Sequence, residues 1–144
     1  MKIVVQRVLS ASVDVDNKTV GAVDKGFLVF FGAAKGDTKD DADRLAKKVC
    51  NLRIFEDENE RINKSLGDVG GGLLVISQFT LCADCSHGNR PSFFEAMAPD
   101  DASDLYDYFC EQCKNYVEKV EKGIFGAKME VKLVNDGPFT IVLE

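Results

Sequence analysis

The sequence predicts a single mixed α/β domain that spans residues 1–144. Three observations favour this fold class. Short β-branched and apolar runs alternate with turn residues in the first third of the chain, two amphipathic helical segments follow, and the length is close to that of one ordinary domain. No repeat, low-complexity segment or linker divides the chain.

The first third of the chain is predicted to be rich in β-strands. We expect strands at residues 2–9 and 11–15, and a turn at Asp16-Asn17 that leads into a third strand at 19–23. A continuously apolar run at 27–32 follows the next turn. Because such runs are typical of strands buried on both faces, this strand is expected to be central in a sheet.

Two helices are predicted. The first begins after Thr38, whose hydroxyl can cap the first turn, and the second begins at Pro99, which is favoured at the first helical position. Apolar residues three and four apart define the expected buried stripe of each helix. In the first helix these are Ala42, Leu45, Ala46 and Val49. In the second they are Ala102, Leu105, Phe109, Tyr116 and Val120.

The remaining elements are short. We expect strands at 53–55 and 73–77, the second after a flexible turn of three glycines, and a structured loop at 82–99 with one apolar patch, Phe93-Phe94. Alternation at 129–133 predicts a half-exposed strand. The run Asn135-Asp136-Gly137-Pro138 is then expected to turn the chain back into a last strand at 139–143.

Charge and hydropathy exclude several classes of protein. The 24 acidic and 18 basic residues give a net charge of −6, the opposite of what a sequence-independent nucleic-acid binder needs. No apolar stretch is long enough to cross a bilayer, and the N-terminus lacks the features of a secretory signal. We therefore expect a cytoplasmic protein without membrane association, whose contact with any nucleic acid is confined to a small patch.

The cysteines invite a metal-site interpretation. Cys82 and Cys85 form one CxxC pair and Cys110 and Cys113 another, and His87 lies close to the first pair. The second pair falls inside a predicted helix, and the gap between the pairs exceeds the usual zinc-ribbon spacing. We therefore expect no metal and no cofactor. Since His87 is the only histidine, we also expect catalysis that does not depend on histidine.

Two segments depart from the pattern of ordinary core strands. The buried run at 73–76 ends in the polar cluster Ser77-Gln78-Phe79-Thr80, and such clusters at strand ends often line a binding crevice. The alternative is a strand that fades into a loop, with its hydroxyls bonded to local backbone. The second segment contains Gly137-Pro138, which forms either a hairpin turn or, with a cis bond, a rigid corner whose two carbonyls point the same way.

Together these segments resemble those of the D-aminoacyl-tRNA deacylases. The resemblance is carried by MKIVVQRVLSASVDV at the N-terminus, SQFTL at 77–81, GNRPSF at 88–93, YDYF at 106–109 and NDGPFT at 135–140. It implies a barrel-like sheet flanked by two main helices, and a cytoplasmic homodimer. The implied reaction is hydrolysis of the ester between a D-amino acid and the 3′-terminal adenosine of tRNA. Glycyl-tRNA is implied as a second substrate.

The resemblance also implies roles for particular residues. The pocket for the aminoacyl group and the terminal adenosine would be lined by Ser77, Gln78, Phe79 and Thr80. Gly137-Pro138 would be a cross-subunit element, braced by Arg7, whose carbonyls clash with an L side chain inside the partner's pocket. Cys82, Cys85 and His87 depart from the small or polar residues usual in this family, which leaves metal binding or redox sensitivity open.

The implied chemistry leaves alternatives open. An aminoacyl ester is already activated, so water must be positioned and the oxyanion must meet backbone N–H donors. Either Thr80 or the 2′-hydroxyl of the substrate assists, and we favour the 2′-hydroxyl. Lys2, Lys25 and Arg90 are candidate phosphate contacts. Two other functions compete: a zinc-stabilised binding module, and a relative that binds RNA without catalysis.

Overall fold

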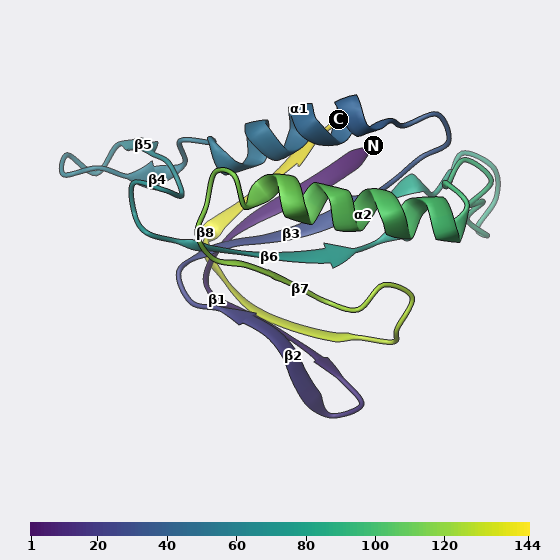
Figure 1. Cartoon of the computed structure of the whole chain (residues 1–144), viewed down its shortest axis with the longest axis horizontal. Coiled ribbons are helices and arrows are strands. Elements are labelled where there is room, and N and C mark those ends of the chain that lie inside the picture. Colours follow the sequence, from purple (N-terminus) through teal and green to yellow (C-terminus); the bar gives the residue numbers. More distant parts are fainter.

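The sheet is built around the long first strand, β1 (Lys2–Val15), in the computed structural model of residues 1–144 (Figure 1). β1 pairs antiparallel with β3 (Gly26–Gly32) through its first half and with β2 (Lys18–Val23) through its second half. On its other edge it pairs with β8 (Glu130–Leu143) along most of its length. β3 pairs in parallel with β6 (Gly72–Ser77), and β6 pairs in parallel with β7 (Val120–Lys122).

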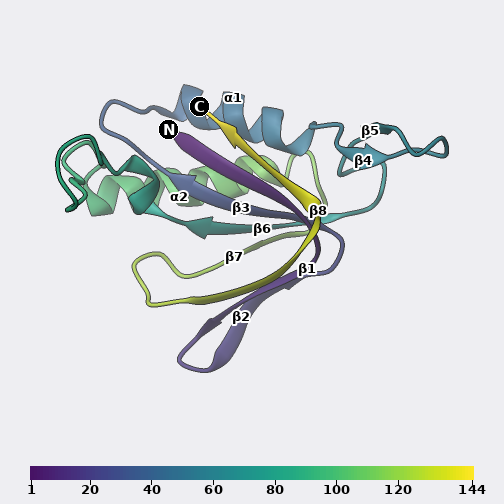
Figure 2. The ribbon, with the colours of Figure 1, turned by 180° about the vertical axis from the view of Figure 1, so that it is seen from behind.

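The sheet curls toward a barrel because β1 is bent. The second half of β1 and the attached β2 lie beneath β3 and β6, as the view from behind shows (Figure 2). β2 approaches both β6 and β7 there, so the sheet nearly closes on itself. The predicted mixed α/β fold with a barrel-like sheet is confirmed.

Two helices cover one face of the sheet, α1 (Lys39–Cys50) and α2 (Pro99–Cys113) (Figure 1). α1 begins as predicted: the Asp41 backbone N–H donates to Thr38 Oγ1 (3.5 Å), and the Thr38 N–H donates to Asp41 Oδ2 (2.8 Å). Its expected stripe is buried throughout. Neither helix is long and apolar enough to span a membrane.

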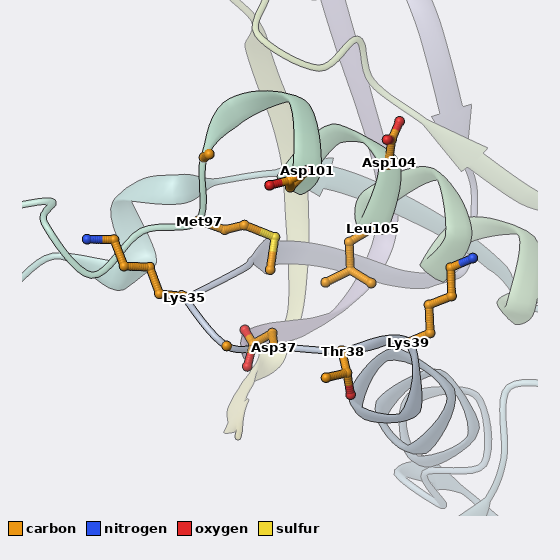
Figure 3. A pocket seen from close by; sticks show the side chains of 10 residues that line it. Lys35, Asp37, Thr38, Lys39, Met97, Asp101, Asp104 and Leu105 are labelled. Carbon is orange, nitrogen blue, oxygen red and sulfur yellow. The ribbon is translucent and has the colours of Figure 1, made fainter.

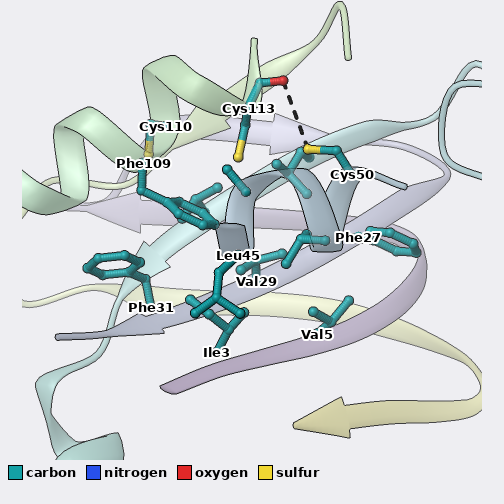
Figure 4. Packing of buried hydrophobic residues seen from close by; sticks show 14 of the residues in the cluster. Ile3, Val5, Phe27, Val29, Phe31, Leu45, Cys50, Phe109, Cys110 and Cys113 are labelled. Atoms are coloured by element: carbon teal, nitrogen blue, oxygen red, sulfur yellow. Dashed lines mark hydrogen bonds between the residues drawn. The ribbon is translucent and has the colours of Figure 1, made fainter. Parts of the chain in front are cut away.

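β3 and β6 are buried on both faces, which explains their continuous apolar sequence. The cluster between sheet and helices includes Phe27, Val29, Phe31, Leu45 and Phe109 (Figure 4). The cluster inside the curl consists of Val8, Ala11, Val13, Val23, Leu28, Leu74 and Ile76. Successive residues of β3 therefore supply opposite cores, as alternation along a strand requires.

The prediction for the end of the second helix is wrong. α2 ends at Cys113, where Lys114 and Asn115 donate to carbonyls three residues back and so form tight turns. Tyr116 is consequently exposed, and Val120 lies in β7 rather than on the helix. Neither glycine nor proline marks this end in the sequence, so the apolar period predicts a longer helix than the one that forms.

The predicted turn at Asn135–Pro138 is also wrong, because β8 continues through it as one strand. Between the pairs Gln6–Thr140 and Val8–Asn135, β1 advances two residues while β8 advances five. The extra residues bulge out of the ladder and form a corner in the middle of the strand. We call the segment Asn135–Phe139 the β8 corner.

Two smaller differences concern other strands. The strands expected at 2–9 and 11–15 are one continuous strand, β1. The strand expected at 53–55 is displaced to β4 (Phe55–Glu56), which pairs with β5 (Ile62–Lys64) in a hairpin that extends from the body of the protein (Figure 1).

Candidate functional site

The polar stretch predicted as a site lies where β6 ends. Ser77 is the last residue of β6, and the Gln78 N–H still donates to the Phe31 carbonyl of the neighbouring strand (2.7 Å). The chain then enters the short 3₁₀ helix η1 (Phe79–Cys82). The side-chain amide of Gln78 donates to Thr80 Oγ1, the one side-chain hydrogen bond of Thr80. Thr80 therefore has no histidine or carboxylate partner that could remove its proton.

A cavity of about 280 Å³ adjoins this stretch. Its volume is close to the lower limit for small-molecule sites. One wall comes from the end of β6, and the other comes from the segment between β7 and β8 together with the start of β8. The lining residues are Ile76, Ser77, Gln78, Phe79, Phe125, Gly126, Ala127, Met129 and Val131. The cavity is thus apolar along most of its wall and polar beside Ser77 and Gln78.

The second wall of this cavity is absent from the sequence-based prediction of the site. The alternation at 129–133 predicts only a half-exposed strand that includes Met129 and Val131, and no pattern assigns Phe125. The one sequence feature that indicates this wall is Gly126, because glycine is favoured at sharp turns. In the structure Gly126 has a positive φ of 76° and forms such a turn. The turn directs the following residues back toward the end of β6.

A larger hollow of about 520 Å³ lies between the starts of α1 and α2 (Figure 3). It contains no residue of the predicted site. Two of its polar groups already have partners: Thr38 caps α1, and Asp37 Oδ2 accepts from the Ala34 N–H (2.7 Å) and pairs with the Met1 ammonium (2.6 Å). The functional site is therefore better placed at the smaller cavity.

The β8 corner is held from inside by Asn135. The Phe139 N–H donates to Asn135 Oδ1 (2.6 Å), and Asn135 Nδ2 donates to Thr140 Oγ1 (3.1 Å). The Gly137-Pro138 peptide at its tip is cis. Gly137 has a φ of 146°, and a Cβ there would lie 2.9 Å from the Phe139 nitrogen, so the position requires glycine.

Arg7 of β1 fixes the β8 corner from behind. It is 7% exposed, and its Nε donates to the Asp136 carbonyl (3.1 Å) while Nη1 donates to the Ile54 carbonyl (2.6 Å). Nε also lies 3.4 Å from the Asp136 carboxylate, and the guanidinium lies 4.7 Å from the centre of the Phe139 ring. A buried charge with these partners ties the corner to β1 and to the segment before β4.

The β8 corner and the polar stretch lie at opposite ends of the sheet. Across the strands, Asn135 pairs with Val8, Val8 with Gly26, and Gly26 with Gly72, the first residue of β6. Ser77 is at the other end of β6, about 17 Å away at roughly 3.3 Å per residue. A single chain therefore does not bring the two predicted segments together.

The two CxxC pairs do not converge on a metal site. Cys110 and Cys113 are buried in the helix-facing core, and Cys85 is exposed. No group of three or more His, Cys, Asp or Glu side chains is placed to hold a metal ion. Burial raises the pKa of the Cys110 thiol to about 12, so this thiol is a packing group at neutral pH. The zinc-stabilised module thus lacks a set of ligands.

The three candidate phosphate contacts have different surroundings. Lys2 Nζ pairs with Glu144 (3.5 Å), and Lys25 Nζ lies 5.6 Å from the centre of the Phe55 ring. Arg90 is exposed in the loop after η1 and makes neither an ion pair nor a side-chain hydrogen bond within the chain. Of the three, Arg90 is the one whose charge is fully available.

Comparisons with known proteins identify the sequence family. Residues 4–144 match the sequence family described as D-Tyr-tRNA(Tyr) deacylase. The chain is 54% identical over 144 residues to the D-aminoacyl-tRNA deacylases of Thermosipho africanus and Clostridium novyi, covering 100% of this chain and 97% of each relative.

Two solved structures share the fold of this chain over nearly its whole length. A structure described as c-Myc DNA Unwinding Element Binding Protein superposes with a TM-score of 0.94 at 41% identity, covering 100% of this chain and 98% of that chain. A probable eukaryotic D-amino acid tRNA deacylase superposes with a TM-score of 0.82 at 20% identity, covering 99% and 97%, which is a likeness of fold.

Proposed function

The chain belongs to the D-Tyr-tRNA(Tyr) deacylase family, and on that basis we propose that it hydrolyses the ester between a D-amino acid and the 3′-terminal adenosine of tRNA. The observation that carries the proposal is the cavity of about 280 Å³ beside Ser77–Thr80, which is apolar on one side and polar on the other. Such an enzyme is an ester hydrolase that proofreads translation, and it works in the cytoplasm, where tRNA is charged and used.

The two sides of the cavity suit the two parts of the substrate. Phe125 and Met129 offer apolar surface for the adenine base, while Ser77 and Gln78 lie where the ribose and the ester enter. The aminoacyl group then lies against η1, with Thr80 at the start of that turn. In this arrangement Ser77, Gln78, Phe79 and Thr80 bind and position the substrate.

The hydrolysis requires little from protein side chains. The ester is activated, so the enzyme needs to position a water molecule and to stabilise the oxyanion, for which the first N–H groups of η1 are free of helical partners. Thr80 has no base beside it. We therefore assign the assisting role to the 2′-hydroxyl of the terminal ribose and a positioning role to Thr80.

Selection against L-amino acids is assigned to the β8 corner of a partner copy. Gly137 and Pro138 are exposed in the single chain and lie about 17 Å along the sheet from its own Ser77. A corner that cannot reach its own cavity is free to enter the cavity of a second copy. Exposed apolar residues on or beside β8, Leu9 (55%), Val134 (51%) and Val142 (57%), support the pairing of two copies.

Rejection by this corner is steric. Backbone carbonyls at Gly137-Pro138 would clash with an L side chain, and a D side chain would point away from them. The α-carbon of glycine carries a hydrogen at both the D and the L side-chain positions, so glycyl-tRNA is expected to be accepted as well. Arg7 serves this selection by holding the corner in place through Asp136 and Phe139.

The test is hydrolysis of D- and L-tyrosyl-tRNA and of glycyl-tRNA by the purified protein. We expect the D and glycyl esters to be cleaved and the L ester to survive, with the same rates after treatment with a chelator. Equal cleavage of D and L esters would contradict the proposed selectivity, and no cleavage of any ester would contradict the activity. Loss of activity with the chelator would instead favour a metal-dependent protein.

A further inference from the structure

Three phenylalanine rings lie exposed next to the candidate site. Phe79, Phe93 and Phe94 are 55%, 38% and 74% exposed. The Phe79 and Phe93 rings pack edge to face, with 5.1 Å between their centres. Because Phe79 also lines the cavity, the paired rings of Phe79 and Phe93 form an apolar surface that continues outward from it, and Phe94 directly follows Phe93 in the chain. We call the three residues the aromatic platform.

The loop that carries Phe93 and Phe94 is held on both sides. Ser92 exchanges two backbone hydrogen bonds with Asp84, at 2.8 and 2.9 Å. On the other side the Lys35 N–H donates to the Glu95 carbonyl (2.9 Å), and the Met97 N–H donates to the Ala33 carbonyl (3.0 Å). The exposed rings therefore project from a fixed backbone, and binding there requires little ordering of the loop.

Two basic residues, Lys35 and Arg90, supply positive charge for the aromatic platform. Lys35 Nζ lies 3.4 Å from the centre of the Phe94 ring, and its side chain points away from the other residues of the larger hollow (Figure 3). Arg90 is exposed four residues before Phe94 and has no partner within the chain. Aromatic rings with adjacent cations are the arrangement by which proteins bind single-stranded nucleic acids, through base stacking and phosphate contact.

We propose that the aromatic platform stacks the unpaired nucleotides that precede the terminal adenosine of the substrate, and that Lys35 and Arg90 contact their phosphates. This inference rests on the proposed function. With the terminal adenosine in the cavity beside Phe79, the strand that leads to it passes the platform. Stacking supplies affinity without many phosphate contacts, which explains how a protein of net charge −6 binds an RNA end.

Two substrates that share the ester but differ in RNA separate this inference from the proposed function. D-tyrosyl-tRNA contains the preceding nucleotides, and D-tyrosyl-adenosine lacks them. We expect Phe94→Ala to lower kcat/KM on D-tyrosyl-tRNA by about 5- to 150-fold, the range for loss of one stacking ring. The same variant should leave kcat/KM on D-tyrosyl-adenosine unchanged, and Phe94→Tyr should retain activity on both substrates.

Tyr116→Ala is the matched control, since Tyr116 is an exposed aromatic residue (41%) after the end of α2 and outside the aromatic platform. It should change neither rate. An equal loss on both substrates with Phe94→Ala, or no loss on the tRNA, would overturn the inference. A change of Phe94→Ala from dimer to monomer in gel filtration would also overturn it, because the platform would then be an interface between copies. Failure of the unmodified protein on both substrates would overturn the proposed function itself.

Discussion

Replacing Arg7 by methionine tests how the β8 corner is held. Methionine keeps the apolar stem but removes the donors to the carbonyls of Ile54 (2.6 Å) and Asp136 (3.1 Å). Ile54 is buried, so its carbonyl loses a charge-assisted bond worth about 1.5–3 kcal/mol and gains no water in exchange. Asp136 is partly exposed, and water replaces most of what it loses. The free energy of unfolding should fall by about 3 kcal/mol.

For a chain of this size each kcal/mol lowers Tm by about 2–4 °C, so Arg7→Met should lower Tm by roughly 6–12 °C. The assay is thermal unfolding followed by circular dichroism at fixed protein concentration, because Tm of a dimer depends on concentration. The matched control is Arg44→Met, which removes an exposed arginine 3.7 Å from Asp41 and should lower Tm by less than about 2 °C.

The same variant should discriminate less between D- and L-tyrosyl-tRNA, because the corner is no longer fixed to β1. A Tm of Arg7→Met within about 2 °C of the unmodified protein would refute the assigned role of these hydrogen bonds. Lower stability with unchanged D/L selectivity would show that Arg7 supports the fold and not the corner.

Three further predictions concern the cap, the buried thiol and the ester chemistry. Thr38→Ala should lower the free energy of unfolding by about 1 kcal/mol, measured by urea denaturation, and Thr38→Ser should restore it; no loss would mean that the capping box is not formed in solution. Burial raises the pKa of Cys110 from 9.0 to about 12, so as the pH rises this thiol ionises in the unfolded chain before it ionises in the folded one. The stability that the neutral buried thiol contributes is therefore complete below about pH 8 and is lost between about pH 9 and 12. Cys110→Ala should flatten this alkaline decline in urea titrations, and an unchanged slope would count against the shift. Thr80→Ala should weaken hydrolysis of D-tyrosyl-tRNA, while a substrate that ends in 2′-deoxyadenosine should be almost inert; full activity on the deoxy substrate would return the assisting role to Thr80.

Local features of the fold could be predicted because neighbouring residues determine them. The continuous apolarity of β3 indicated burial on both faces, and Thr38 with its acidic neighbours indicated the start of α1. The end of α2 could not be located, since no glycine or proline stops the helix at Cys113. The path of β8 was also out of reach, because the same residues suit a hairpin turn and a bulge, and only pairing with β1 decides between them.

In the candidate site, too, the features set by neighbouring residues could be predicted and those set by distant residues could not. Ser77–Thr80 was found because polar residues interrupt a buried strand, which is visible in one short window of sequence. The opposite wall, Phe125 to Val131, belongs to a different part of the chain and reaches the cavity only through the curl of the sheet. The contacts of Arg7 with Asp136 likewise join residues 129 positions apart, and only the fold brings them together.

The central claim, that one copy completes the cavity of the other, can be tested by mixing two impaired variants. Ala127→Trp blocks the cavity and leaves the corner intact, whereas Gly137→Val displaces the corner and leaves the cavity intact. Ala127→Trp alone should cleave neither D- nor L-tyrosyl-tRNA, and Gly137→Val alone should cleave both, because its open cavities lack the corner that excludes L side chains. If corners act across the dimer, refolding an equal mixture should roughly halve the L-ester hydrolysis per Gly137→Val chain, since about half of these chains then face an intact corner. D-ester hydrolysis per Gly137→Val chain should not change. Unchanged L-ester hydrolysis in the mixture would contradict the account.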